Sequence, residues 1–393
     1  MQLFSQRPAR NGAVWNNWNS TFPLNVYLQS IQDLIMKKED LIQICHHIWP
    51  YLTKEEFLHH NYTSVFEYFT ENGRTAPIRR NSLDSIGISE VISIIGQLTT
   101  VDNALASRAN AITCARLKLP DSMSESTVLG CLDMALRMIL TLNIRPISHL
   151  RDLSTSPMPP TIIYWRPDLS LHDAIEAHFI ENTQVTRSMT TGRIDPSISL
   201  PYLCTYRGFR IFWTSNLAEH LSISWNSKII TVYEHKIFLW NHLRDTKRTV
   251  IPRPILEEAI DTLNLLFPLN DPLTKTYLTQ NGKTFSGLGY CTRPRDRSLE
   301  LGKFNFWRDR IADLVGIMNE QPRGLRQLAL ERNGRNMMPF VTFWVATAVA
   351  ILTILNLPFA IVSMRYAMLQ YDLALAQACS DPGAQNTLPQ FCG

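Results

Sequence analysis

Two short clusters near the amino terminus, Cys45-His46-His47 and His59-His60, hold the densest groups of side chains that could bind a metal ion. A structural zinc site takes four nitrogen or sulfur ligands in a tetrahedral array. Neighbouring residues on a helix diverge by about 100°, so at most one or two side chains of each cluster can converge on one ion. The spacing therefore favours surface histidines that flank a turn, and it predicts no metal site.

Two further groups could support acid–base chemistry. His172 and Glu176 share one face of an expected helix, with His178 close by, but two ligands do not complete a metal site. Between residues 204 and 242 the chain holds three histidines and a glutamate, namely His220, Glu234, His235 and His242. An enzyme site in this region would need a concave pocket in which such groups converge.

Motifs that bind phosphate or activate a nucleophile are incomplete. Gly282-Lys283-Thr284 resembles the end of a phosphate loop, but Tyr277 stands where that loop needs glycine so that backbone amides can wrap phosphates. Gly287-Leu-Gly289 lacks the third glycine of a dinucleotide site, and no Gly-x-Ser-x-Gly elbow is present. The sequence thus assigns no catalytic residue, cofactor or metal, and a net charge of +4 does not indicate a nucleic-acid partner.

The most informative stretch is the run 337–364, which contains no charged residue. A helix needs roughly 20 apolar residues to cross a bilayer core, and backbone amides inside that core must be paired, so the run predicts a transmembrane helix. Phe340, Phe343 and Trp344 stand near its start, where aromatic side chains gather at membrane surfaces. The competing interpretation is a buried core helix, which is usually shorter and carries a polar face.

Asn356 and Pro358 interrupt this apolar run. Proline removes a backbone hydrogen bond and kinks a helix, so a kinked single span is the plainest expectation. An asparagine in hydrocarbon can also hydrogen-bond a partner helix, which would make Asn356 a self-association site. A re-entrant hairpin is a third interpretation, although each half of the run would then be too short to cross the bilayer.

Positive charge beside the run sets the expected orientation, because Lys and Arg close to a span stay on the cytosolic side. Arg365 alone follows the run, whereas four arginines precede it: Arg323, Arg326, Arg332 and Arg335. We therefore expect a single-pass protein with its large amino-terminal part in the cytosol and its short tail in the lumen or outside the cell. The four arginines could equally bind anionic lipid.

Seven cysteines are scattered along the chain without a Cys-x-x-Cys pair, as expected for a protein whose bulk lies in a reducing compartment. Cys379 and Cys392 belong to the tail. In an oxidising compartment these two residues could form a disulfide, and two unrelated free thiols are the alternative.

Hydrophobic spacing divides the remaining chain into a helical part and a mixed part. Apolar residues recur at helical intervals in 24–35, 88–98 and 128–142, and the patterns at Thr53–Glu56 and Ser122–Glu125 are typical of helix caps. Alternating residues then predict strands at 209–213, 221–225 and 228–233, followed by helices at 236–244, 255–267 and 304–320. The last of these helices either packs on a domain or lies on the membrane surface.

We therefore expect a mainly α protein with a small α+β domain and one carboxyl-terminal transmembrane helix. The expected segments are a loose amino terminus (1–22), a helical domain (23–151), a Ser/Pro linker (152–160), an α+β domain (161–297), juxtamembrane helices (298–336), the span (337–364) and a tail (365–393).

Several segments together resemble a large group of uncharacterised single-pass membrane proteins of filamentous fungi, over roughly residues 200–365. They are Ile211–His220, Val232–Leu239, Phe306-Trp-Arg-Asp-Arg310, Arg332-Asn-Gly and Phe343-Trp-Val345. The resemblance implies a membrane anchor and a fungal source, often a lineage-variable accessory gene, and it carries no known chemistry. Asn356-Leu-Pro358 departs from the unbroken apolar run of that group.

Three functions remain open from the sequence. The first is a membrane-anchored cytosolic interaction or regulatory module that binds a protein partner and gains effective concentration from its anchor. The second is an enzyme with a site in the 204–242 region, and the third is a membrane-active oligomer. The lipid bilayer is the expected partner in each case, together with a protein partner or a second copy of the chain.

Overall fold

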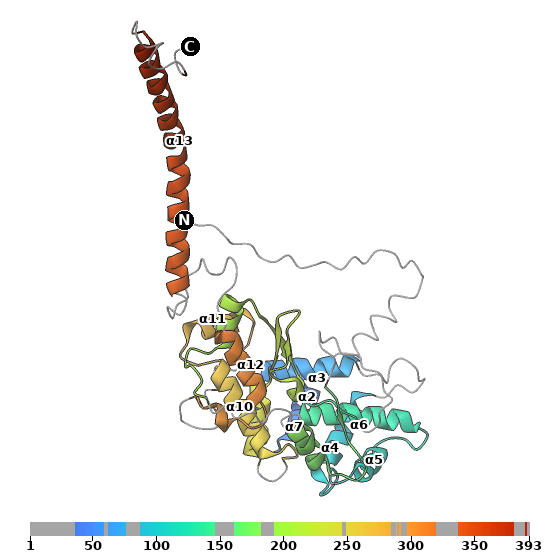
Figure 1. Ribbon diagram of the computed structural model, residues 1–393. Coiled ribbons are helices and arrows are strands. Elements are labelled where there is room, and N and C mark those ends of the chain that lie inside the picture. The colour runs from blue at the N-terminus through green and yellow to red at the C-terminus, as the bar shows by residue number, and fades with distance from the viewer. Residues whose placement is uncertain are drawn as a thin grey trace, which may run out of the picture. The chain divides into compact units, whose positions relative to one another are not determined.

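The computed structural model describes residues 36–58, 62–75, 87–145, 161–181, 192–245, 249–283, 288, 291, 297–319, 337–380 and 390. Within these residues the protein is mainly α-helical, with two small sheets and one long apolar helix at the carboxyl end (Figure 1). The expected fold class is confirmed. The loose amino terminus, the spacing at 24–35 and the linker 152–160 lie outside the described residues.

The structure divides into two compact units that interleave along the chain. The first unit holds the chain up to Ile180 together with Ser215–Glu219 and Tyr233–Leu256, and the second holds the other segments. The domain limits expected from the sequence are consecutive segments, whereas the chain passes between these two units more than once. We call the described residues before 337 the head.

Helices build most of the first unit. Helix α4 lies against α2, α5 and α6, so it is enclosed by neighbours. The expected helices at 88–98, 128–142 and 236–244 are present. The elements of this unit are α2 (Lys38–Ile48), α3 (Thr63–Thr75), α4 (Ile88–Thr100), α5 (Arg108–Arg116), α6 (Glu125–Leu140), β1 (Ile144–Arg145), β2 (Ile163–Tyr164), α7 (Leu171–Glu181) and α9 (Lys236–Arg244).

Helix α6 is the core helix of the first unit, because nearly all of its side chains are buried. It begins after Ser124, whose hydroxyl accepts a hydrogen bond from the Thr127 backbone N–H and so satisfies an amide that the helix leaves unpaired. The cap therefore lies inside the expected segment Ser122–Glu125. At the other end Thr141 adopts a left-handed backbone, with φ 50°, and its hydroxyl hydrogen-bonds the Tyr233 hydroxyl at 2.7 Å.

Helices α2 and α4 approach each other closely at Gly96. A side-chain carbon at this position would lie 3.0 Å from the His47 ring, which is tighter than ordinary van der Waals contact. Glycine therefore allows the His47 ring to pack directly on the backbone of α4. In the segment after α2, the Thr53 backbone N–H donates to the Glu56 carboxylate at 2.8 Å, as the capping pattern predicts. The element that follows is only a short 3-10 turn, Glu56–Leu58.

The second unit contains the expected small sheet. Its strands are β3 (Arg210–Thr214), β4 (Ile223–Ser224) and β5 (Ile229–Tyr233), in the order β3-β5-β4. Strands β4 and β5 are antiparallel, with Ile223 opposite Ile230. The chain reverses between them through Lys228, which has a positive φ of 51°. The parallel pair β1–β2 of the first unit was not expected from the sequence.

Helix α10 (Arg253–Leu266) carries the chain from the first unit into the second, which also holds α8 (Leu200–Tyr202), α11 (Pro272–Gln280) and α12 (Arg308–Asn319). Asp271 caps α11 by accepting hydrogen bonds from two backbone amides of its first turn. Ile311, Leu314 and Met318 of α12 are buried. Helix α12 therefore packs within its own unit. Of the two expected placements, this favours packing on a domain over lying on the membrane surface.

Candidate functional site

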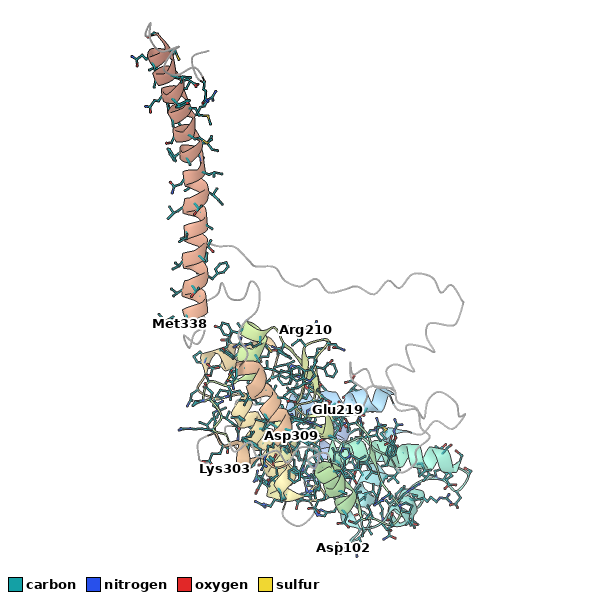
Figure 2. All side chains as sticks on the ribbon, in the orientation of Figure 1. Asp102, Arg210, Glu219, Lys303, Asp309 and Met338 are labelled. Carbon is teal, nitrogen blue, oxygen red and sulfur yellow. The ribbon has the colours of Figure 1, made fainter. Side chains whose placement is uncertain are left out.

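The long carboxyl-terminal helix α13 (Met337–Cys379) is the most distinctive candidate site of the protein. It has 43 residues, which at 1.5 Å per residue gives a length of about 64 Å. Its most apolar window has a mean hydropathy of 2.3, and no part of that window is buried in the protein. Figure 2 shows side chains projecting from all sides of this helix beyond Met338. By length and composition α13 can cross a bilayer core, which is about 30 Å thick.

Aromatic side chains cluster in the first turns of α13, where the sequence predicts a membrane-surface belt. The Trp344 ring lies edge-on to Phe343 at 5.9 Å and to Phe340 at 6.4 Å between ring centres. Phe343 and Trp344 are exposed. Such rings combine apolar area with polarisable edges and gather at the boundary between hydrocarbon and water. Their position near one end of the apolar segment fits that boundary.

Helix α13 passes through Asn356 and Pro358 without a break (Figure 1). The two-segment hairpin is therefore not formed. The Asn356 amide is exposed and has no hydrogen-bond partner among the described residues. In contrast, the hydroxyls of Thr347 and Thr353 donate to backbone carbonyls one turn earlier, at 2.9 Å and 2.8 Å. Threonine thus satisfies its own polar group inside the helix, while asparagine leaves donors and an acceptor available to a second helix.

The end of α13 differs from the expected end of the span. The sequence places the limit at 364, where the charged residue Arg365 begins the tail, but the helix continues to Cys379. The continuation adds about 20 Å of helix beyond Arg365. The four topology arginines, Arg323, Arg326, Arg332 and Arg335, lie outside the described residues. Their effect on orientation stays a prediction.

A partly buried series of hydrogen-bonded side chains in the first unit joins residues of the predicted 204–242 region. The Ser215 hydroxyl lies 2.9 Å from His235 Nε2 and donates to Glu234 Oε1 at 3.3 Å. On the other side of the ring, His235 Nδ1 lies 3.4 Å from the Ser64 hydroxyl of α3. Ser215 and Ser64 carry no motif, so sequence reasoning missed them. The Glu234 oxygen lies 3.8 Å from Nε2, on the serine side of the ring, whereas a catalytic triad places its acid at the opposite nitrogen.

The other two histidines of that region have separate surroundings. His242 packs against Phe238 and Trp49, with ring centres 4.5 Å and 5.5 Å away. Burial lowers the pKa of His242 to about 4, so the ring is neutral near pH 7. His220 Nε2 lies 2.8 Å from the Thr262 hydroxyl, and burial, reinforced by the charge of Arg310, lowers the pKa of His220 to about 3. The contacts of His220 and His242 thus differ from those of His235.

Two of the segments that carry the fungal resemblance meet inside the second unit, where Trp307 and Arg310 contact His220. The Trp307 ring lies edge-on to His220 at 5.5 Å, and the Arg310 guanidinium donates to the His220 carbonyl. The Glu258 carboxylate accepts three backbone N–H bonds of 2.7 to 2.8 Å from Asn305, Phe306 and Trp307. These amides precede α12 and would otherwise be unpaired. Burial raises the pKa of Glu258, while the three amide bonds and Arg308 lower it. The Trp-Arg-Asp-Arg motif thus positions α12 in the fold.

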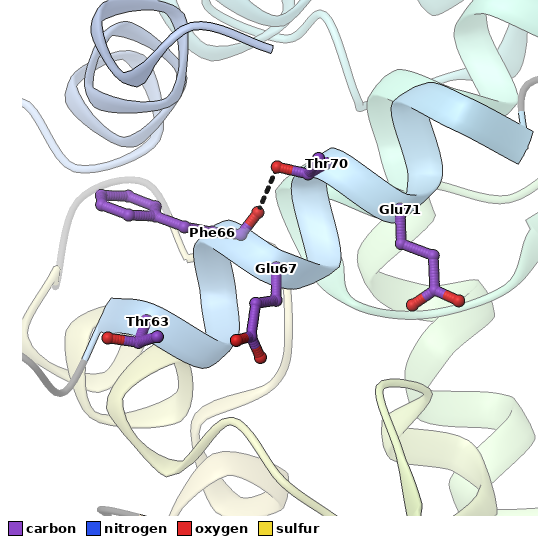
Figure 3. Close-up of a pocket in the computed structure, with 5 residues that line it drawn as sticks. All are labelled: Thr63, Phe66, Glu67, Thr70 and Glu71. Atoms are coloured by element: carbon purple, nitrogen blue, oxygen red, sulfur yellow. Dashed lines mark hydrogen bonds between the residues drawn. The ribbon is translucent and has the colours of Figure 1, made fainter. Parts of the chain in front are cut away.

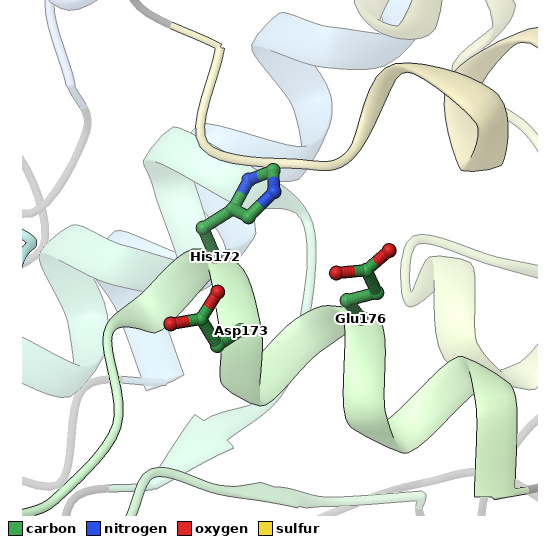
Figure 4. Close-up of side chains that lie close together, drawn as sticks. All are labelled: His172, Asp173 and Glu176. Atoms are coloured by element: carbon green, nitrogen blue, oxygen red, sulfur yellow. The ribbon is translucent and has the colours of Figure 1, made fainter.

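Three exposed side chains at the start of α7 lie close enough to share an ion: His172, Asp173 and Glu176 (Figure 4). Their ligand atoms lie within 4.8 Å of one another. His172 Nδ1 lies 3.0 Å from the Val250 carbonyl, which fixes the ring. Asp173, however, accepts from the Ser170 hydroxyl at 2.7 Å while its own N–H donates back to that oxygen. This reciprocal pair is a helix cap, and it accounts for Asp173 without a metal ion.

One face of α3 borders an open pocket of about 550 Å³ (Figure 3). Its described lining consists of Thr63, Phe66, Glu67, Thr70 and Glu71. The Thr70 hydroxyl is already bonded to the Phe66 carbonyl at 2.8 Å. Its described lining holds two exposed glutamates and no basic side chain. The pocket therefore shows no arrangement that indicates catalysis.

The amino-terminal metal-type clusters show no common site in the part of the chain that is described. Cys45 is fully buried, and burial raises the pKa of its thiol. Burial, together with the neighbouring His46, lowers the pKa of His47, which packs on Gly96. His59 and His60 lie outside the described residues.

Comparisons with known proteins add no functional information about these groups. The chain matches no family model, no curated protein and no solved structure.

Proposed function

We propose that this protein is a single-pass, membrane-anchored module whose head lies in the cytosol and binds a protein partner there. The observation that carries the proposal is α13, whose apolar window is not buried by any other described residue. Leaving such a surface in water would be costly. Burial of apolar surface is worth about 25 cal/mol per Å², so a helix of this size needs lipid or another protein around it. Lipid suits a helix that is apolar on all sides.

The proposed orientation rests on the arginine asymmetry around α13 in the sequence. An anchor confines the head to a surface and raises its effective concentration toward partners on the same membrane. The resemblance to fungal single-pass proteins leads us to propose a fungal accessory gene as the source.

Alkaline extraction combined with protease protection tests the anchor and the orientation together. We expect a protein tagged at its amino terminus to stay in the membrane pellet at high pH. Protease added outside sealed microsomes should remove the amino-terminal tag, while a tag at the carboxyl terminus should be protected. Release into the alkaline supernatant would overturn the anchor, and protection of the amino-terminal tag would overturn the orientation.

Self-association through the span is the second candidate function, and the exposed Asn356 amide favours it. An Asn-to-Asn contact between helices in lipid is worth on the order of 1 kcal/mol. Asn356→Leu should then reduce the oligomer in mild detergent by several-fold, as measured by light scattering. Thr353→Val, one turn earlier, is the matched control because its hydroxyl is satisfied within α13. An unchanged oligomer in Asn356→Leu argues against the candidate.

A further inference from the structure

The turn between strands β4 and β5 is exposed at one end of the three-stranded sheet. All four of its residues, Trp225–Lys228, are exposed, and Trp225 is 54% accessible to solvent. The Lys228 backbone N–H donates to the Trp225 carbonyl at 3.4 Å, and the Lys228 carbonyl accepts from the Arg210 backbone N–H at 2.8 Å. These bonds bring Arg210, the first residue of β3, to the same end of the sheet. We call Arg210 and Trp225–Lys228 the sheet tip.

The sheet tip carries positive charge that the described residues do not neutralise. The side chains of Arg210 and Lys228 are exposed, and neither forms an ion pair with a described residue. Strands β3, β4 and β5 and the turn contain no Asp or Glu. Two cations therefore stand beside an exposed indole ring without an acidic side chain in the same sheet.

This combination of side chains matches the chemistry of an anionic membrane surface. Tryptophan gathers at the boundary between lipid and water, where its apolar ring is buried and its N–H stays near polar groups. Lys and Arg are attracted to the negatively charged headgroups of the cytosolic leaflet. The ring of Trp225 and the charges of Arg210 and Lys228 would thus act together at one surface.

We propose that the sheet tip docks on the anionic cytosolic leaflet of the membrane that holds α13. This inference rests on the proposed function, because it needs α13 in the bilayer and the head in the cytosol. Helix α12, in the same unit as the sheet, ends at Asn319, and α13 begins at Met337. The limited length of chain between them keeps the second unit near the bilayer, so even a weak contact with lipid is favoured by its high effective concentration.

Docking would give the head a defined orientation on the membrane. A single anchor leaves the head free to turn, whereas a second contact at the sheet tip fixes which of its surfaces faces away from the lipid. The surface available to a protein partner is then the one opposite the tip.

Hydrogen exchange of the full chain in lipid nanodiscs tests the contact. The backbone N–H groups of Asn226 and Ser227 donate no hydrogen bond within the described residues, so slower exchange there reports a surface that covers the tip. We expect their exchange to be about fivefold slower, or more, in nanodiscs that contain phosphatidylserine than in pure phosphatidylcholine. Salt at about 0.5 M should remove the difference, because it screens the charges.

Variants of exposed residues assign the effect to the sheet tip. One cation near an anionic surface changes the ratio of docked to free tip by about fivefold, so Arg210→Ala with Lys228→Ala should abolish the difference between the two lipids. Trp225→Ala should reduce it several-fold. The matched control is Arg116→Ala with Lys118→Ala, which removes two exposed cations of the first unit and should leave the difference unchanged. Near-UV circular dichroism checks that each variant is folded.

Three results would overturn the docking. The first is equal exchange in neutral and anionic nanodiscs, and the second is a lipid difference that survives in Arg210→Ala with Lys228→Ala. The third is slow exchange in lipid-free detergent, either without additions, which would mean that protein covers the tip, or only with glycerophosphoserine, which would mean a site for a small anion. Alkaline extraction reports the anchor independently, so failure of the docking is distinguishable from failure of the proposed function.

Discussion

The two most apolar helices among the described residues, α4 and α13, have opposite surroundings. Helix α4 (Ile88–Thr100) has 13 residues, too few to cross a bilayer core, and its apolar side chains are buried by α2, α5 and α6. Helix α13 has 43 residues, and no other described residue buries its apolar window. Apolar side chains of the same kinds are thus buried by protein in α4 and exposed in α13.

The contrast extends to polar groups. In the head, Glu258 and His220 are buried but hydrogen-bonded, since a buried polar group without a partner is costly. In α13 the polar groups either satisfy themselves, as Thr347 and Thr353 do, or stay exposed, as Asn356 does. These buried polar groups of the head are thus paired within the protein, whereas Asn356 has no hydrogen-bond partner among the described residues.

Two lysines in α13 should give the largest effect. Ala350→Lys with Ile354→Lys places two charges on one face of the helix centre, and each raises the free energy of insertion by about 3 kcal/mol. We expect the double variant to move from the membrane pellet to the alkaline supernatant. Ala350→Leu is the control and should stay in the pellet. Full retention of the lysine variant would show that α13 is held by protein and not by lipid.

Replacing one isoleucine by alanine in each helix should give the second-largest difference between α4 and α13. Ile95 of α4 is fully buried, so Ile95→Ala should lower the free energy of unfolding of the head by about 2 to 5 kcal/mol. Ile354 of α13 is 68% exposed, and Ile354→Ala should leave the unfolding of the head unchanged. Thermal unfolding of the detergent-solubilised full chain, followed by near-UV circular dichroism, measures both. Equal shifts in the two variants would mean that α13 packs on the head.

Lowering the pH should reduce the stability of the head alone, and by less than the preceding substitutions do. The pKa of His242 falls from an ordinary value of 6.5 to about 4 in the folded state, so its stabilising contribution is complete above 6.5 and is lost as the pH falls toward 4. Between pH 7 and pH 5 this one group should lower the free energy of unfolding by about 2 kcal/mol. His242→Phe keeps a ring against Trp49 and should show a smaller loss over that interval.

Thermal unfolding at the two pH values measures this loss. His220, whose pKa is also lowered by burial, adds a similar dependence that remains in the His242 variant. An identical pH dependence in wild type and His242→Phe would contradict the burial of His242. Alkaline extraction of α13 should not respond to this substitution.

Elements with a strong local pattern could be predicted from the sequence. The alternation around Ile211 and Ile230 gave the strands β3 and β5, and the apolar spacing from Val128 gave α6. The pair β1–β2 could not be predicted, because each strand has two residues and exists only through the other. The continuation of α13 to Cys379 could not be read from the apolar run, because Arg365 ends the run but does not end the helix.

The polar residues of the 204–242 region could likewise be predicted only in part. Sequence proximity grouped Glu234 and His235, and both contact the Ser215 hydroxyl in the structure. It also grouped His220 and His242, which have different partners in the structure. Ser64 could not be found in this way, because its contact with His235 joins residues 171 positions apart.

By itself the sequence determined the presence of a long uncharged run, because length and the lack of charge are properties of consecutive residues and decide whether a helix can enter a bilayer. It also determined the local helices and strands whose apolar periods are regular. Only the tertiary structure decided which histidines meet a serine or a carboxylate, and that the Trp-Arg-Asp-Arg motif positions α12 through Glu258 and His220. Those contacts depend on distant segments that pack together, and a linear pattern does not contain that information.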